Sequence, residues 1–159
     1  MRVFIGTDHA GLEFKEHLKR ALAEAGHDPV DCGAYTYDAE DDYPPFCFDV
    51  GERVVTEPGT LGVVIGGSGN GEQIAANKVP GVRAALVWNT DTAKLARQHN
   101  DANVVAVGAR QHSVEEATEL VLLFLATPFS GDERHSRRIG LVTDYEQNRH
   151  RPAGGLPTR

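Results

Sequence analysis

Short apolar segments alternate with amphipathic segments along most of the chain. Apolar residues of the amphipathic segments recur at helical spacing; Phe14, Leu18 and Leu22, for example, share one face of a helix that Gly26 ends. Valine-rich runs that alternate with helices indicate a parallel sheet covered by helices on both faces. The expected strands are residues 3–5, 30–32, 61–65, 82–87 and 104–107.

Five such strands joined by right-handed crossovers predict a three-layer α/β/α, Rossmann-like fold with a five-stranded parallel sheet in the order 2-1-3-4-5. This order puts the first and third strands side by side, and their carboxyl ends flank the point where such folds bind ligands. An extra C-terminal helix is expected from about Asp132 to Glu146. We therefore expect one domain over residues 1–146 and a disordered tail over 147–159.

A glycine-rich loop between an apolar strand and a helix carries the most informative chemistry. Glycine lets the backbone turn sharply and approach a ligand closely, and the amides at a helix start favour negative charge. A Walker A loop would need lysine where Glu72 stands, and the dinucleotide fingerprint would need glycine there. The loop therefore suits oxyanion stabilisation beside a carboxylate base, although Glu is also ordinary in a first helical turn. Its glycines are Gly66, Gly67, Gly69 and Gly71.

Two polar groups elsewhere are candidates for the same site. Asp8-His9 closes the first strand, where it could move a proton, contact phosphate or bind a metal, or Asp8 could only cap the following helix. Arg134 and Arg138 are four residues apart on one helical face, so they could hold one phosphate or pair with surface acids. Arg110 follows the fifth strand and points to the same ligand-bearing edge.

Two loops and one apolar run have open interpretations. The acidic segment 38–45 is a solvated connection or a lid. The segment 97–103 is rich in side chains able to bond sugar hydroxyls, although such a composition is common in loops. The apolar run 120–126 is too short to span a membrane and is a buried helix or an oligomer face.

Composition limits the classes of function. The net charge of -7 at pH 7 argues against a nucleic-acid-binding protein, and no segment has the roughly 20 apolar residues that cross a bilayer. The seven histidines contain no HExxH motif, so no metal site is expected. Cys32 and Cys47 lack metal or redox spacing, which favours packed, reduced thiols in a cytoplasmic protein, with a catalytic cysteine as a minor alternative.

Six segments occur together and in order: Asp8–Gly11 with Lys15, Asp42–Pro44, Gly67–Lys78, Arg97–Asp101, Gly108–Arg110 and Arg134–Arg138. Together they resemble the ribose-5-phosphate isomerase type B family, a sugar-phosphate isomerase family that includes allose-6-phosphate and galactose-6-phosphate isomerases. The resemblance spans residues 1–146. It implies that ribose 5-phosphate and ribulose 5-phosphate interconvert through a cis-enediolate, as in the pentose phosphate pathway, without metal or organic cofactor. It also implies a homodimer with active sites shared between subunits.

The resemblance assigns a role to each matching residue. Glu72 would move the proton between carbons 2 and 1, because the cysteine base of another branch of the family is replaced by Gly66 here. His99, assisted by Asp8, would open the furanose ring, and this His99 loop would reach Glu72 of the neighbouring subunit. Ser68 and the backbone at Gly67, Gly69 and Gly71 would stabilise the enediolate. The substrate-binding residues would be Asn100 for hydroxyls, Tyr43 beside the sugar, and His9, Arg110, Arg134 and Arg138 for the phosphate.

Two alternatives stay open at this point. A six-carbon sugar phosphate of the allose 6-phosphate type would need only a different pocket length. A non-catalytic domain could bind a phosphate ligand at the same edge without turnover, although it would not need an acid in the loop. The apolar run 120–126 could also pair dimers into a tetramer.

Overall fold

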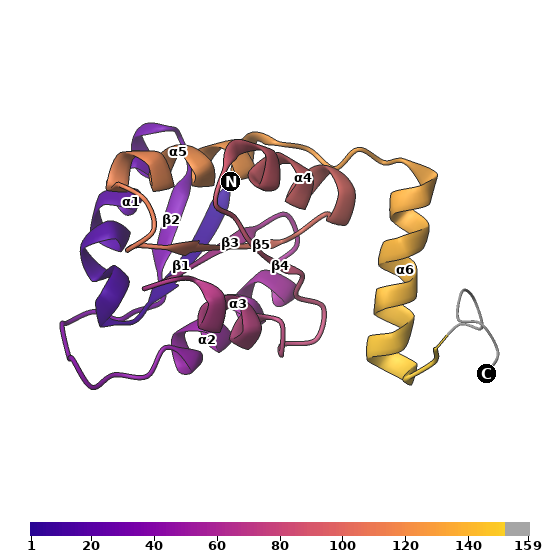
Figure 1. The fold of residues 1–159 in the computed structure, drawn as a ribbon, viewed down its shortest axis with the longest axis horizontal. Helices are drawn as coiled ribbons and strands as arrows, with labels where there is room; N and C mark the ends of the chain where they lie inside the picture. The colour runs from indigo at the N-terminus through magenta and orange to yellow at the C-terminus, as the bar shows by residue number, and fades with distance from the viewer. Residues whose placement is uncertain (152–159) are drawn as a thin grey trace.

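A parallel five-stranded sheet forms the centre of the molecule, and helices cover both of its faces (Figure 1). The computed structural model describes residues 1–151. The strands are β1 (Arg2–Thr7), β2 (Asp28–Asp31), β3 (Leu61–Gly66), β4 (Ala84–Leu86) and β5 (Val104–Gly108). The helices are the 3-10 turn η1 (His9–Gly11), α1 (Leu12–Glu24), α2 (Pro44–Thr56), α3 (Asn70–Ala76), α4 (Thr90–Asn100), α5 (Val114–Ala126) and α6 (Glu133–Asn148).

The expected fold class is confirmed, but the expected strand order is wrong. The observed order is β2-β1-β3-β5-β4, so β5 takes the place expected for β4 beside β3. All five residues of β5 are buried, whereas β4 has three residues, of which only Ala84 is buried. A wholly apolar strand buries most surface between two neighbours, and a short strand suits an edge.

The neighbours that matter for the site are as expected. β1 pairs with β3 in parallel from Val3 opposite Leu61 to Thr7 opposite Ile65. Their carboxyl ends therefore lie side by side, and the segments that follow them meet at one edge of the sheet. We call this edge the carboxyl edge and the opposite edge the amino edge.

Alternate residues of each central strand enter two different cores. Ile5 and Val63 pack in the core under α1, α4 and α5, while Phe4 and Val64 pack in the core under α2 and α3. This is the period of two that a strand buried on both faces requires. The apolar run 120–126 lies mainly in the first core, with Val121 and Phe124 fully buried, as the buried-helix interpretation requires.

Helix α6 differs from the others because most of it projects from the body (Figure 1), although the Gly81 amide donates a hydrogen bond to Oε2 of Glu146 at 2.8 Å. Its only buried residue is His135. The helix expected from about Asp132 to Glu146 is present and continues to Asn148, into the segment expected to be a tail; the expectation for residues 152–159 lies outside the described part. None of the helices among residues 1–151 has the length and apolar content to cross a membrane.

Candidate active site at the carboxyl edge

Glu72 lies in the first turn of α3 with its carboxylate packed against the end of β3. Glu72 is buried, with only 5% of the residue's surface exposed. A Cβ placed on Gly66 would overlap both carboxylate oxygens, so Gly66 leaves the space that the carboxylate fills. Glu72 could therefore not occupy this position if residue 66 carried a side chain, including that of cysteine.

The surroundings of Glu72 favour its protonated form. Burial raises the pKa of Glu72 above its ordinary value, and the negative charge of Asp8 raises it further, while a hydrogen bond from the Glu72 amide partly opposes both. The carboxylate is therefore a stronger base than a solvated one once it is ionised.

The loop before α3 is shaped by two glycines. Gly69 caps α3 with φ of 81°, and a Cβ there would lie 2.7 Å from Cδ1 of Leu86. A Cβ on Gly71 would lie 2.7 Å from Cζ of Tyr43, so the tyrosine ring packs directly on this turn. Ser68 Oγ accepts a hydrogen bond from the Asn70 amide at 3.3 Å and thereby orders the start of α3. Ser68 thus belongs to the loop that leads to Glu72, and Tyr43 packs against that loop.

Asp8 is buried at the end of β1. One of its oxygens accepts a hydrogen bond from the Ala10 amide at 3.0 Å, which is the cap that one interpretation of the sequence expected. The same carboxylate is close enough to Glu72 to raise the pKa of that residue. The cap and a place in the site are therefore compatible.

Two basic side chains lie at the carboxyl edge, Arg110 beside the glycine loop and His9 after the end of β1. The Arg110 amide donates to the Gly67 carbonyl at 3.1 Å, and Nη1 of Arg110 would lie 3.6 Å from a Cβ on Gly67. The His9 ring lies 2.6 Å from Asp41, measured from Nδ1 to Oδ1. The hydrogen bond to Asp41 raises the pKa of His9; burial opposes this, Asp8 adds to it, and Arg110 opposes it. Arg110 at the loop and His9 after the end of β1 are thus two basic groups of the kind that bind anions.

Asp8, His9 and Asp41 place potential metal-ligating atoms within 4.8 Å of one another. The short hydrogen bond to Asp41 engages Nδ1 of His9, so the ring is held as a donor. We interpret this group as part of the anion site. Asp41 was not singled out from the sequence because it is one of four acids in segment 38–45, and no spacing distinguishes it from the others.

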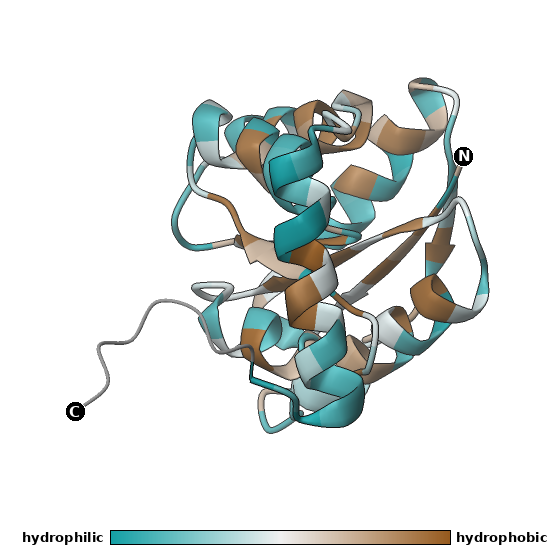
Figure 2. Cartoon of the chain, turned by 90° about the vertical axis from the view of Figure 1, so that its right-hand side faces the viewer, coloured by the Kyte–Doolittle hydropathy of each residue, from teal (hydrophilic) through white to brown (hydrophobic). Residues whose placement is uncertain are grey.

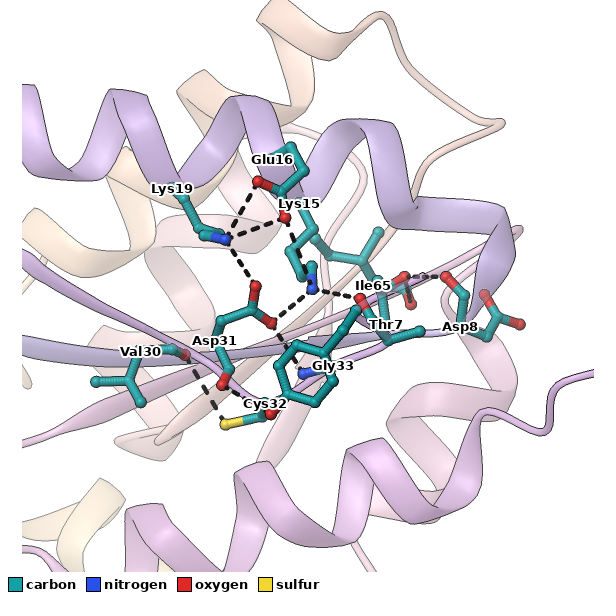
Figure 3. Close-up of polar contacts among 12 residues, drawn as sticks. Thr7, Asp8, Lys15, Glu16, Lys19, Val30, Asp31, Cys32, Gly33 and Ile65 are labelled. Carbon is teal, nitrogen blue, oxygen red and sulfur yellow. Dashed lines mark hydrogen bonds and ion pairs between the residues drawn. The ribbon is translucent and has the colours of Figure 1, made fainter. Parts of the chain in front are cut away.

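A buried ion pair fixes the backbone next to Asp8 (Figure 3). Lys15, which has no exposed surface, places Nζ 2.5 Å from Oδ1 of Asp31 and 2.5 Å from the Ala34 carbonyl. Burial alone would raise the pKa of Asp31, but hydrogen bonds from Lys15, Lys19 and the Gly33 amide lower it below its ordinary value. Gly33 and Ala34 exchange hydrogen bonds with Thr7, the residue before Asp8. Lys15 therefore helps to hold the end of β1 in place.

The structure does not bring His99, Asn100, Arg134 and Arg138 to Glu72 of the same chain. Helix α4 starts beyond the carboxyl end of β4 and ends at Asn100, shortly before β5 begins, so His99 lies at the amino edge. A six-residue strand such as β3 spans roughly 20 Å. The two groups of residues are therefore at opposite edges of the sheet.

The start of α6 is docked on the end of α4 at this amino edge. The rings of His99 and His135 have centroids 4.2 Å apart, and Nδ1 of His135 lies 3.3 Å from the Gln98 carbonyl. Arg134 is exposed and only 3.9 Å from Asp132, a pair that contributes little in solvent. Arg138 is exposed and has no ion pair among residues 1–151. The surface-pair interpretation thus holds for Arg134, weakly, and the described residues offer no such pair for Arg138.

Each edge also carries a hollow. One of about 550 Å³ adjoins the glycine loop and is lined by Ser68, Leu86 and Trp88 among others. Another of about 540 Å³ lies at the amino edge, between the starts of the strands and Arg97.

Both cysteines are free and buried, as the sequence analysis expected. Burial raises the pKa of Cys32 and of Cys47 to about 12. A thiol with so high a pKa is a poor nucleophile near neutral pH, because the thiolate is the reactive form. Neither cysteine is therefore a good candidate for the base.

Comparison with known proteins gives consistent matches over nearly the whole chain. The profile of the family described as Ribose/Galactose Isomerase matches residues 3–142. The ribose-5-phosphate isomerase B of Mycobacterium tuberculosis (strain ATCC 25618 / H37Rv) is 53% identical over 152 residues, which cover 96% of this chain and 94% of that protein.

Solved structures agree. The type B ribose 5-phosphate isomerase of Trypanosoma cruzi matches with a TM-score of 0.89 and 48% identity, covering 94% of this chain and 98% of that one. The ribose-5-phosphate isomerase B of Mycoplasma genitalium, solved with bound ribulose-5-phosphate, matches with a TM-score of 0.88 and 41% identity, covering 92% and 97%.

Proposed function

Because the chain belongs to the ribose/galactose isomerase family, we propose that it interconverts D-ribose 5-phosphate and D-ribulose 5-phosphate. The observation that carries this proposal is the Glu72 carboxylate, buried against Gly66 at the start of a glycine loop, with Arg110 beside that loop and His9 next to Asp8 at the end of β1. A carboxylate beside backbone amides suits proton transfer from carbon, and the two cations suit a phosphate at the other end of the substrate.

In this mechanism Glu72 removes the proton from carbon 2 of the open-chain aldose. The electron pair of the broken C–H bond forms the double bond of a cis-enediolate, whose negative oxygens face the amides around Gly69 and Gly71 and the hydroxyl of Ser68. Glu72 then returns the proton to carbon 1 while the hydroxyl proton of oxygen 2 passes to oxygen 1, so that carbon 2 becomes the carbonyl of the ketose. Proton removal and return balance without an external oxidant, and the proposal assigns no metal or organic cofactor.

We further propose a homodimer in which each site is shared between subunits. The proposal gives His99 of the partner subunit, assisted by Asp8, the opening of the furanose ring. Asn100 of the partner subunit would hold hydroxyls, and Arg134 and Arg138 of the partner subunit would join His9 and Arg110 on the phosphate. This is supported by the placement of these residues at the edge opposite Glu72 in one chain.

The surface of α6 supports self-association. The surface of this projecting helix is mainly polar but includes apolar positions (Figure 2). Its exposed apolar residues are Leu141, Val142 and Tyr145. Apolar groups exposed on a projecting helix favour burial against another molecule. We propose that α6 lies against the second subunit; pairing of dimers into a tetramer remains a further hypothesis. The free thiols of Cys32 and Cys47 support a reducing, cytoplasmic location.

The test is turnover of ribose 5-phosphate by the protein treated with EDTA, compared with Glu72→Gln and with Glu115→Gln. Glu115 is the matched control, because it is an exposed acid in the first turn of another helix. We expect the chelator and Glu115→Gln to leave turnover unchanged and Glu72→Gln to lower kcat by about 10²–10⁴-fold, the usual contribution of a general base.

The other outcomes each overturn part of the proposal. Full activity of Glu72→Gln would mean that the base lies elsewhere, with Asp8 next in line. Turnover of allose 6-phosphate in preference to ribose 5-phosphate would change the substrate to a six-carbon sugar. Binding without turnover would leave a phosphate-binding domain. Sedimentation as a monomer at micromolar concentration would contradict the shared site.

A further inference from the structure

Asp41 makes two hydrogen bonds to one residue. Its Oδ1 accepts from the His9 backbone amide at 3.1 Å and lies 2.6 Å from Nδ1 of the His9 ring. Its Oδ2 is buried and has no hydrogen-bond partner among residues 1–151. The side chain of Asp41 is 13% exposed. His9 is therefore the one group of the described chain that hydrogen-bonds this nearly buried carboxylate.

The geometry also leaves the other side of the imidazole available. Nε2 of His9 makes no hydrogen bond within the described chain, and the His9 side chain is 24% exposed. The ring stands edge-on to Tyr37, with centroids 5.9 Å apart, and Tyr37 comes from the same loop as Asp41. Because Nδ1–H is committed to Asp41, Nε2 is the nitrogen that faces an arriving anion, and it carries a hydrogen to donate when the ring is an imidazolium.

We propose that Asp41 is the positioning residue for the phosphate site: it orients the His9 ring and holds it as an imidazolium whose Nε2–H faces the substrate phosphate. The inference rests on the proposed function for the identity of the ligand. Asp41 itself does not touch the substrate. This role makes Asp41 part of the binding machinery, although the segment 38–45 that carries it has the composition of a solvated connection.

The charges around His9 favour this assignment. Asp41 faces the ring from the loop, Asp8 from the end of β1 and Arg110 from the residues after β5. A nearly buried carboxylate without a cationic partner is costly, so Asp41 stabilises the charged ring, while burial of the ring and the charge of Arg110 oppose it. The imidazolium therefore persists to a higher pH than that of a solvated histidine.

The KM for the substrate should depend on the protonation of His9. Below the pKa of His9 the ring is cationic and KM is low, and KM rises as pH climbs through that pKa. In Asp41→Asn the hydrogen-bond acceptor remains but the charge is lost, so the rise in KM begins at a lower pH. The ionisation of the substrate phosphate is common to both proteins and cancels in their ratio.

The first experiment follows the His9 ring by NMR, with and without inorganic phosphate, in the wild type and in Asp41→Asn. The His9 signal is identified by its loss in His9→Gln. We expect the wild-type ring to titrate above about 6.5, the ordinary value for histidine, and higher still with phosphate; Asp41→Asn should lower both values. A wild-type ring that titrates at or below 6.5, or one unaffected by Asp41→Asn, would overturn the inference.

The second experiment measures KM and kcat for ribose 5-phosphate across pH in the same variants. The matched control is Glu40→Gln, which removes one negative charge from an exposed position of the same segment. Between the two His9 pKa values, Asp41→Asn should raise KM about tenfold with kcat nearly unchanged, and Glu40→Gln should match the wild type. A KM increase that is the same at every pH would mean a structural role only. Because the ring titration needs no turnover, an inactive wild type would refute the proposed function and leave this inference to be decided by NMR.

Discussion

The carboxyl edge and the amino edge of the sheet carry the two halves of the proposed site in opposite ways. At the carboxyl edge Glu72 and Asp8 are buried. The neighbouring glycine loop is packed so closely that a Cβ added to Gly66, Gly69 or Gly71 would collide with a neighbouring side chain. At the amino edge Arg134 and Arg138 are exposed on a helix that stands away from the body. The proposed base is therefore built into the core of one chain, whereas the arginines proposed to bind phosphate lie on its surface.

This difference has a physical reason. A base that must remove a proton from carbon benefits from a dry, fixed surrounding, which only the interior supplies. Arginines that hold a dianionic phosphate can stay solvated until the substrate arrives. One chain thus folds around its base and can offer its arginines to another chain. Four experiments test this division.

The largest effect is expected from Gly66→Ala. Its Cβ would overlap the Glu72 carboxylate, so the base must leave its position. We expect turnover to fall by about 10²-fold or more and the melting temperature to drop. The control is the same change in a Glu72→Ala background, where the space is empty and Gly66→Ala should cost little more. Equal losses in both backgrounds would show that Gly66 acts independently of Glu72.

Mixed dimers test whether the two edges belong to different subunits. Chains carrying Glu72→Gln and chains carrying His99→Gln are co-expressed with different tags, and the heterodimer is purified. One of its two shared sites keeps both residues, so we expect about half of the wild-type turnover from two inactive parents. A heterodimer of a wild-type chain with a doubly substituted chain should be nearly inactive. The reverse pattern would place both residues in one chain's site.

Arg134→Ala and Arg138→Ala test the exposed half. A phosphate contact is present in the ground state and in the transition state alike, so its loss raises KM and leaves kcat nearly unchanged. We expect KM to rise about 10-fold or more for each, and the melting temperature to stay within a degree or two because both side chains are exposed. Arg137→Ala, on the same helix and also exposed, is the control. An unchanged KM in both variants would remove these arginines from the site.

The smallest effect is a shift in the pH profile. Glu72 must be ionised to accept a proton, so kcat/KM is full above its pKa and falls as pH falls through it. Because burial, reinforced by Asp8, raises that pKa, the acid limb should lie above about 4.3, the ordinary value for glutamate. Asp8→Asn removes the negative charge that adds to the pKa of Glu72, so the acid limb of kcat/KM should move to lower pH. Asp91→Asn, at an exposed position, should leave the acid limb unchanged. An unmoved limb would mean that the limb does not report Glu72.

Much of this arrangement was predictable from local patterns. The period-two alternation within buried strands and the helical spacing of Phe14, Leu18 and Leu22 predict the three layers, and the glycine loop ending in Glu72 predicts the base at the end of the third strand. The strand order was not predictable in the same way. The apolar runs of β4 and β5 look alike in sequence, and their relative depth depends on what else packs on them.

The parallel α/β architecture and the glycine loop with Glu72 were predictable from the sequence, because hydrophobic periodicity and glycine spacing are local patterns. Other features became visible in the folded chain alone. Strand β5 lies between β3 and β4, Gly66 leaves space for the Glu72 carboxylate, and Asp41 hydrogen-bonds the His9 ring. His99 and Arg134 lie at the edge opposite Glu72. These are contacts between distant segments, and they depend on how layers pack rather than on any local spacing.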